Sequence, residues 1–282
     1  ELYMASVTKR IGEIKQPKGG YLKPSAFIKI EMHDGIVLNE NENIHSSIVG
    51  MTVDYLTRFI IGADLPDAFE VSLRGASIAE LMGQENSLLT AEKLLRGIIG
   101  IDDASVVNAC KLVTFDVWQR NPLAALMAKS YNDTNPDKAT IQNIQTLVKR
   151  SKTFFEEYGY PIKDGFTFEP VKEDELAHNK MLKTGKGTYG GYTAIVSSGD
   201  GDFLTEDTMW DFKVTKSKLT NKHTLQLLMY WIMGQHSGQE IYKKITRLGI
   251  FNHRLNIVYL LDIKDISNDI INVVEKEVIC YE

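Results

Sequence analysis

The chain has 282 residues, of which 43% are hydrophobic and 24% are charged, and its net charge is −5. These values exclude a disordered chain and one that is basic throughout, and two cysteines are too few for a disulfide framework or a four-thiolate metal site. No apolar run approaches the ~20 residues that span a bilayer and no apolar signal segment is visible, so we expect a cytoplasmic protein without a membrane partner.

Residues 1–160 are expected to form a largely helical N-terminal portion. Apolar residues recur there at the three-to-four spacing of amphipathic helices, and Asn121-Pro122 and Asn135-Pro136 interrupt the pattern. The predicted helices cover residues 44–61, 77–83, 90–97, 104–119 and 140–158.

After Pro161 the apolar pattern changes towards short strands with one strongly apolar helix. The predicted strands cover residues 192–196, 202–205, 208–214, 246–251 and 256–261, and the predicted helices cover 224–234 and 263–274. We therefore expect an α/β protein in which the helical portion packs on an α/β core of residues 161–282 as one integrated unit.

The segment from Gly199 to Lys213 combines acidic and aromatic residues. A hairpin would bring Asp202 beside Asp211 and Lys213, and the last two share one strand face because they are two residues apart. Burying two carboxylates and an ammonium among aromatic rings is costly unless a cation compensates. Hard oxygen ligands select Mg²⁺ or Mn²⁺, and Lys213 could orient or deprotonate an attacking water. Asp200 competes with Asp202 for the first ligand position.

Two polar residues interrupt the apolar helix predicted over 224–234. Gln226 and Tyr230 are four residues apart and therefore lie on one helix face. Their polar ends need partners in a buried setting, and the acidic–lysine edge or a phosphate group would serve.

This order of residues resembles the PD-(D/E)XK nuclease superfamily. The matching elements are Gly199-Asp200-Gly201-Asp202, Asp211-Phe212-Lys213 and Gln226-x-x-x-Tyr230, which look most like the RecB-type branch with its CRISPR-associated exonucleases, but without their iron–sulfur cysteines. The resemblance implies a restriction-endonuclease-like core, in which helices flank a mixed central sheet. It also implies a Mg²⁺- or Mn²⁺-dependent deoxyribonuclease, with an exonuclease favoured over an endonuclease.

The resemblance further implies a role for each matching residue. Asp202 and Asp211 would bind the metal, the carbonyl of Phe212 would complete its shell, and Lys213 would position the hydrolytic water. His45, on the first predicted helix, matches a histidine that adds a metal contact in some relatives. Beyond the metal, Gln226 and Tyr230 would hold the DNA strand or the lysine.

Positive charge is concentrated in residues 213–254. This window holds eight Lys or Arg and one acidic residue, Glu240, so its net charge is +7 while the rest of the chain carries −12. A local basic block suggests contact with a polyanion. The expected nucleic-acid contacts are Lys216, Lys222, His223, Lys243 and Arg247. The expected partners are single-stranded DNA or a double-stranded end, and a helicase or another recombination or defence protein.

Other interpretations stay open. The chain could be a nuclease-fold module that binds nucleic acid or a partner protein without cutting, or a nuclease that acts on RNA. Thr184-Gly185-Lys186-Gly187-Thr188 only partly fits a phosphate loop, because the upstream Gly and the Ser or Thr after the lysine are missing. His178 is expected on the surface.

Overall fold

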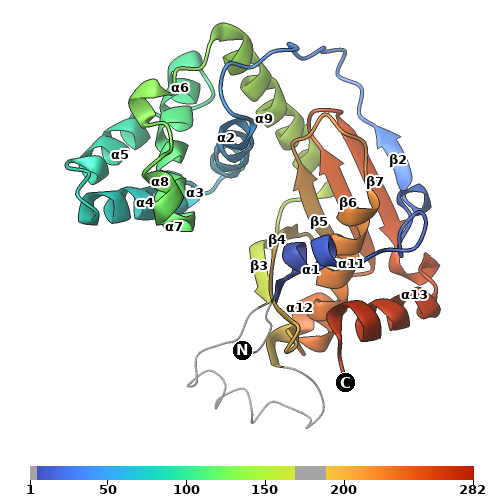
Figure 1. Cartoon of the computed structure of the whole chain (residues 1–282). Helices are drawn as coiled ribbons and strands as arrows, with labels where there is room; N and C mark the ends of the chain where they lie inside the picture. The colour runs from blue at the N-terminus through green and yellow to red at the C-terminus, as the bar shows by residue number, and fades with distance from the viewer. Residues whose placement is uncertain (1–4, 169–188) are drawn as a thin grey trace. The chain divides into compact units, whose positions relative to one another are not determined.

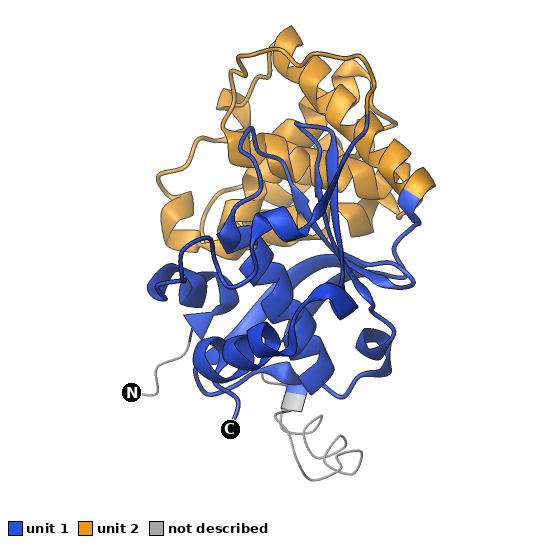
Figure 2. Cartoon of the chain, turned by 90° about the vertical axis from the view of Figure 1, so that its right-hand side faces the viewer, with its two compact units in different colours: residues 1–32, 158–282 blue, residues 33–157 orange. Residues whose placement is uncertain are grey.

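The computed structural model describes residues 5–168 and 189–282, and the chain separates into two compact units. One unit is formed by residues 33–157, and the other by residues 1–32 together with 158–282 (Figure 2). The second boundary lies near the one expected at residue 160. Residues 5–32 pack with the C-terminal strands, whereas the sequence pattern had grouped them with the helices. Thr184–Thr188 and His178 lie outside the described residues.

The unit of residues 33–157 is helical throughout its described secondary structure. Its helices are α2 (Ser46–Ile60), α3 (Leu65–Ala68), α4 (Glu70–Leu81), α5 (Ser87–Arg96), α6 (Asp103–Leu112), α7 (Asp116–Arg120), α8 (Pro122–Ala125) and α9 (Lys138–Tyr158), which crosses the boundary by one residue. The helix predicted over 104–119 is divided by a short 3₁₀ turn at Val113–Phe115. Helix α9 ends before Gly159, whose positive φ of 99° suits the residue after a helix.

The other unit is an α/β structure. Among the described residues, seven strands form one mixed sheet in the order β1-β4-β5-β6-β7-β2, with β3 paired to β4. The strands are β1 (Ala5–Ser6), β2 (Ile28–Glu31), β3 (Lys163–Phe168), β4 (Val196–Leu204), β5 (Thr208–Lys213), β6 (Arg247–Asn252) and β7 (Ile257–Asp262). The β1–β4 and β5–β6 pairs are parallel and the others antiparallel. The expected α/β class with a largely helical N-terminal half is thus confirmed.

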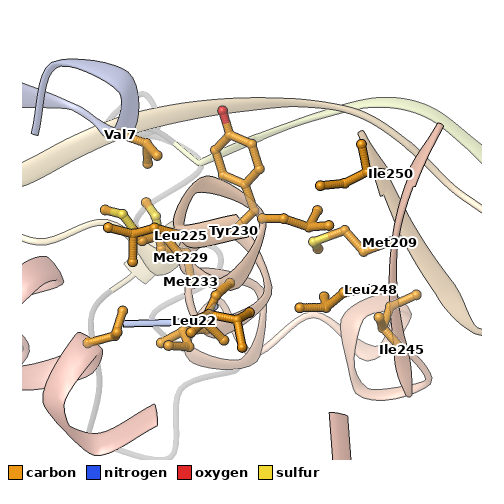
Figure 3. Packing of buried hydrophobic residues seen from close by; sticks show 14 of the residues in the cluster. Val7, Leu22, Met209, Leu225, Met229, Tyr230, Met233, Ile245, Leu248 and Ile250 are labelled. Atoms are coloured by element: carbon orange, nitrogen blue, oxygen red, sulfur yellow. The ribbon is translucent and has the colours of Figure 1, made fainter. Parts of the chain in front are cut away.

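Helix α11 (Asn221–His236) forms the centre of this unit's core. It contacts β5, β6 and α1 (Val7–Glu13), and Figure 1 shows α1 and α11 on the same face of the sheet. In Figure 3, Val7 lies on one side of α11 and the sheet residues Met209 and Ile250 lie on the other. Because α11 is covered on several sides, it is apolar nearly all round instead of amphipathic. Two short helices follow α11: α12 (Glu240–Lys243) precedes β6, and α13 (Asn268–Val273) follows β7 and continues into a π-helical turn, Val274–Ile279.

Several strand predictions were wrong in detail. Only Val196 of the strand expected over 192–196 lies in β4, which continues through Ser197–Gly201. The glycines of β4 weaken its strand signal, yet they make room for aromatic rings: a Cβ on Gly201 would lie 1.8 Å from the ring of Phe166. The C-terminal helix expected over 263–274 is reduced to a 3₁₀ turn and the short α13.

Membrane-spanning helices are not found in the part of the chain that the structure describes. No helix there combines the length and hydropathy that crossing a bilayer requires.

Candidate active site

The hairpin predicted around Glu206-Asp207 is present, and its two strands separate next to Asp202. Pairing of β4 with β5 joins Leu204 to Met209 and Phe203 to Trp210, and it ends there. One residue further, Oδ2 of Asp202 accepts the backbone N–H of Phe212 at 2.5 Å. A side-chain carboxylate thus takes the place of a strand carbonyl and opens a fork between the strands.

Asp211 and Lys213 form an ion pair at this fork. Nζ of Lys213 lies 2.8 Å from Oδ2 of Asp211 and 3.1 Å from its Oδ1. Asp211 is 5% exposed, and no hydrogen bond from a described residue reaches its Oδ2 in addition to the ion pair. The residue between them, Phe212, packs its ring against those of Phe203 and His253. The distances between ring centroids are 4.6 Å and 4.5 Å. Strand alternation therefore separates the charged pair from an aromatic layer.

Helix α11 supplies further polar contacts to the lysine. Nζ of Lys213 donates to Oε1 of Gln226 at 3.3 Å, and Nε2 of Gln226 donates to the hydroxyl of Tyr230 at 3.0 Å. The same Nε2 approaches Oγ1 of Thr8 in α1 at 3.5 Å. The structure thus brings Asp211, Lys213, Gln226 and Tyr230 into one connected network. Thr8 was missed, because it is 218 residues from Gln226 and carries no local signal.

The charges of the network determine its protonation. Burial disfavours the ammonium of Lys213, but the charge and hydrogen bond of Asp211 and the charge of Asp202 outweigh it, so the pKa of Lys213 is raised. Burial, followed by the charge of Asp211, also raises the pKa of Tyr230. The charges of Asp202 and Asp200 raise it further. Lys213 is therefore cationic and Tyr230 protonated at neutral pH.

Asp202 and Asp200 differ in their surroundings. Asp202 is half-buried and bonded to the backbone of β5, whereas Asp200 is exposed and its Cα pairs with Thr167 of β3. The charge of each reaches Tyr230. Asp202 is therefore the better candidate to act together with Asp211.

His223 supports the start of α11. Its Nδ1 accepts the backbone N–H of Thr220 at 3.3 Å, so His223 completes the N-terminal cap of the helix. Burial, followed by the charge of Lys213, lowers the pKa of His223 below its ordinary value of 6.5. His223, which was predicted to contact phosphate, is thus half-buried and already caps α11.

A pH dependence follows from His223. The unfolded chain binds this proton more readily than the folded chain, so the folded state should lose stability as the pH falls below the ordinary value of 6.5. In His223→Gln the loss of thermal stability between about pH 7 and pH 5 should be smaller than in the wild type. Melting temperatures across this range test the prediction, with His33→Gln, which alters an exposed histidine, as the control. A wild-type pH slope in His223→Gln would contradict it.

Gly199 allows Tyr230 to reach the network. A Cβ on Gly199 would lie 2.8 Å from Cγ2 of Val7 and 2.9 Å from Cε1 of Tyr230. We expect Gly199→Ala to displace the Tyr230 ring and to lower the free energy of unfolding by about 1–3 kcal/mol, measured by urea denaturation. Gly12→Ala is the matched control, because Gly12 lies in α1 and a Cβ there would have no neighbouring atom within 4 Å. Equal stability of the two variants would refute this reading of Gly199.

Three predicted residues are not shown to join the network. His45 caps α2 in the unit of residues 33–157, where its Nδ1 accepts the N–H of Ser47 at 3.2 Å. Arg247 begins β6 opposite Thr208, whereas Lys213 pairs with Asn252, so Arg247 lies about 17 Å along the strands from the site. Arg247 is paired with Asp207 at 3.0 Å, and Lys243 is paired with Glu240.

The donor set at the fork can be compared with what a metal requires. Within residues 5–168 and 189–282, no group of three or more His, Cys, Asp or Glu side chains is arranged to hold a metal. Asp202 and the buried Asp211 supply carboxylate oxygens, the type of ligand that Mg²⁺ and Mn²⁺ prefer. They do not form a closed cage of protein ligands.

Comparison with known proteins gives no match for this chain. No family model fits the sequence, and neither a curated protein nor a solved structure matches it.

Proposed function

We propose that the chain is a metal-dependent nuclease that hydrolyses DNA phosphodiester bonds at the fork between β4 and β5. The observation that carries the proposal is the Lys213 ammonium, held between Asp211 and Gln226 beside the point where Asp202 ends the strand pairing. A buried carboxylate and lysine on one strand face, with a second carboxylate from the neighbouring strand, suit hydrolysis of a phosphate ester. This arrangement supports the PD-(D/E)XK resemblance and a restriction-endonuclease-like core.

Asp202 and Asp211 would bind Mg²⁺ or Mn²⁺, with the carbonyl of Phe212 as a further ligand. When bound, such an ion polarises the phosphate and lowers the pKa of a coordinated water. Against the effect of burial, the charge and hydrogen bond of Asp211 raise the pKa of Lys213, so before a cation binds this residue is an ammonium that donates hydrogen bonds. Lys213 would therefore orient the attacking water and stabilise negative charge that develops on the phosphate.

Gln226 and Tyr230 would position the lysine and the strand. Gln226 accepts from Lys213 and donates to Tyr230, so it limits the rotation of the lysine side chain. Since the hydroxyl oxygen of Tyr230 accepts this bond, its proton is available to a phosphate oxygen. Both residues lie on α11, whose side chains are mostly buried in the core, and a site carried by such a helix is held more precisely than one on a loop.

The test is cleavage of end-labelled linear and circular DNA, single- and double-stranded, with Mg²⁺, Mn²⁺ or EDTA. We expect cleavage that requires the metal, and products from linear but not circular DNA would identify an exonuclease. A matched RNA substrate distinguishes the two nucleic acids. Absence of cleavage on every substrate, with retained DNA binding, would contradict the proposal and favour the binding module.

A helicase or another recombination or defence protein is the proposed partner.

A further inference from the structure

Two segments that contain lysines but no acidic residue meet at the start of α11. Residues 14–27 contain Lys15, Lys18 and Lys23, and residues 212–224 contain Lys216, Lys218 and Lys222 besides Lys213. We call the six lysines other than Lys213 the basic rim. All six are exposed.

The two segments are held together by specific contacts. Nε2 of Gln16 donates to the carbonyl of Asn221 at 3.3 Å, and Oγ1 of Thr224 donates to the carbonyl of Leu22 at 2.5 Å. Gly20, with a φ of 96°, packs so closely that a Cβ there would lie 2.5 Å from Cβ of Asn221. The loop that carries Lys15, Lys18 and Lys23 is therefore fixed against the first turn of α11.

The charge of the rim is largely uncompensated. Across the described parts of the chain, no acidic side chain forms an ion pair with the five rim lysines Lys15, Lys18, Lys23, Lys218 and Lys222. Like charges brought together at one surface repel each other unless an anion is bound between them. The protein nevertheless holds the two lysine-containing segments together through the hydrogen bonds that the carbonyls of Asn221 and Leu22 accept from Gln16 and Thr224. This surface therefore favours a ligand with several negative charges.

The rim is continuous with the candidate active site. His223 follows Lys222 directly and is close enough for the charges of Lys213 and Asp211 to affect its pKa. Gln226, about one helical turn further, contacts Lys213. An extended anion bound along the rim would therefore reach the fork, and a chain of regularly spaced phosphates has this form.

We propose that the basic rim binds the phosphate backbone of the polynucleotide strand whose bond is cleaved at the fork, an inference that rests on the proposed function. The contacts would be electrostatic and largely independent of base sequence, because a lysine ammonium acts on the regularly spaced phosphates as a point charge on a flexible stem. Lys243 and Arg247, which the sequence had grouped with Lys216 and Lys222, are not part of this surface. Arg247 lies at the opposite end of the β5–β6 pair and forms an ion pair with Asp207. Lys243 lies in α12 and forms an ion pair with Glu240.

The experiment measures strand binding in EDTA, where cleavage cannot interfere. The rim variant is Lys15→Gln/Lys18→Gln/Lys23→Gln. The matched control is Lys243→Gln/Lys244→Gln/Lys276→Gln, which removes the same charge from exposed lysines of the same unit. Fluorescence anisotropy with labelled single-stranded DNA, single-stranded RNA and polyglutamate, at several KCl concentrations, gives the affinity and its salt dependence.

We expect the rim variant to bind DNA at least about tenfold more weakly and to lose about two units of the salt slope, since each phosphate contact on a single strand contributes about 0.7. The control should change binding less than about threefold. Equal losses in both variants would overturn the proposal, because they would reflect net charge alone. Rim-dependent binding of polyglutamate without nucleic-acid binding would also overturn it. The same loss with RNA supports a backbone contact.

Different results would contradict the basic-rim proposal and the nuclease proposal. If the wild type binds strands through the rim in EDTA but cleaves nothing with Mg²⁺ or Mn²⁺, the nuclease proposal fails and the rim stands. If the wild type cleaves while the rim variant binds and cleaves like the control, the rim fails and the nuclease stands. Unchanged melting temperatures of both variants show that the comparison reports binding and not folding.

Discussion

Lys213→Met is expected to lower the rate of DNA cleavage by about 10²–10³-fold or more, while binding of DNA in EDTA changes little. The ammonium bridges Asp211 and Gln226, and methionine fills a similar volume without a charge or a donor. Asp211→Asn should reduce cleavage at least as much, because it removes the buried carboxylate proposed to bind the cation. Single-turnover rates at saturating enzyme separate this loss from weaker substrate binding.

The two single variants also alter stability. Each leaves one member of a mostly buried ion pair without its partner, which should reduce the free energy of unfolding by roughly 1–3 kcal/mol. The double variant Asp211→Asn/Lys213→Met removes both charges and should recover part of this stability without recovering cleavage. Lys244→Met, at an exposed lysine of the same unit, is the control for both measurements. Wild-type cleavage by Lys213→Met would show that the site is assigned incorrectly.

Asp116→Ala is expected to lower the free energy of unfolding of the helical unit by about 3–4 kcal/mol. Asp116 has no exposed surface, and its two oxygens accept hydrogen bonds from Tyr55 and Ser72, each at 2.5 Å. Arg120 lies 3.7 Å from the same carboxylate and also donates to the hydroxyl of Tyr55. Alanine would leave two buried hydroxyl groups without their acceptor and a cavity between α4 and α7. Urea denaturation followed by circular dichroism measures the loss.

Two further variants make the Asp116 prediction specific. Asp67→Ala, at an exposed acid of α3, should change stability by less than about 0.5 kcal/mol. Burial raises the pKa of Asp116 above its ordinary value of 3.8, so the wild type should lose stability as the pH rises above that value. Asp116→Asn keeps one acceptor oxygen and should remove this dependence. Equal stability of Asp116→Ala and Asp67→Ala would contradict the role given to this carboxylate.

Local periodicity accounts for the parts of the site that could be predicted from the sequence. Asp211 and Lys213 share a strand face because they are two residues apart, and Gln226 and Tyr230 share a helix face because they are four apart. The turn at Glu206-Asp207 is short enough for its residue types to indicate a hairpin. The predicted helices of the first half were also found, since each has its own apolar stripe.

The sequence pattern was misleading where strands are short or rich in glycine. Residues 197–201 of β4 contain two glycines, and β3 has a positive φ of 72° at Gly165, so neither has the alternation of a regular strand. Their pairing is stabilised by Phe166 and Phe168, which pack against Tyr230 and Tyr242. Such packing depends on residues that are far apart in the chain and leaves no local signal.

The sequence by itself determined the α/β class, the acidic hairpin and the spacing of its charged residues, because these depend on neighbours within a few positions. Only the tertiary structure decided that residues 5–32 complete the sheet unit, that Thr8 reaches Gln226, and that the loop carrying Lys15, Lys18 and Lys23 lies beside the first turn of α11. It also decided that Arg247 lies at the far end of the strands from Lys213. These contacts join segments up to 218 residues apart, and their stability comes from burial and pairing in three dimensions, which no local pattern records.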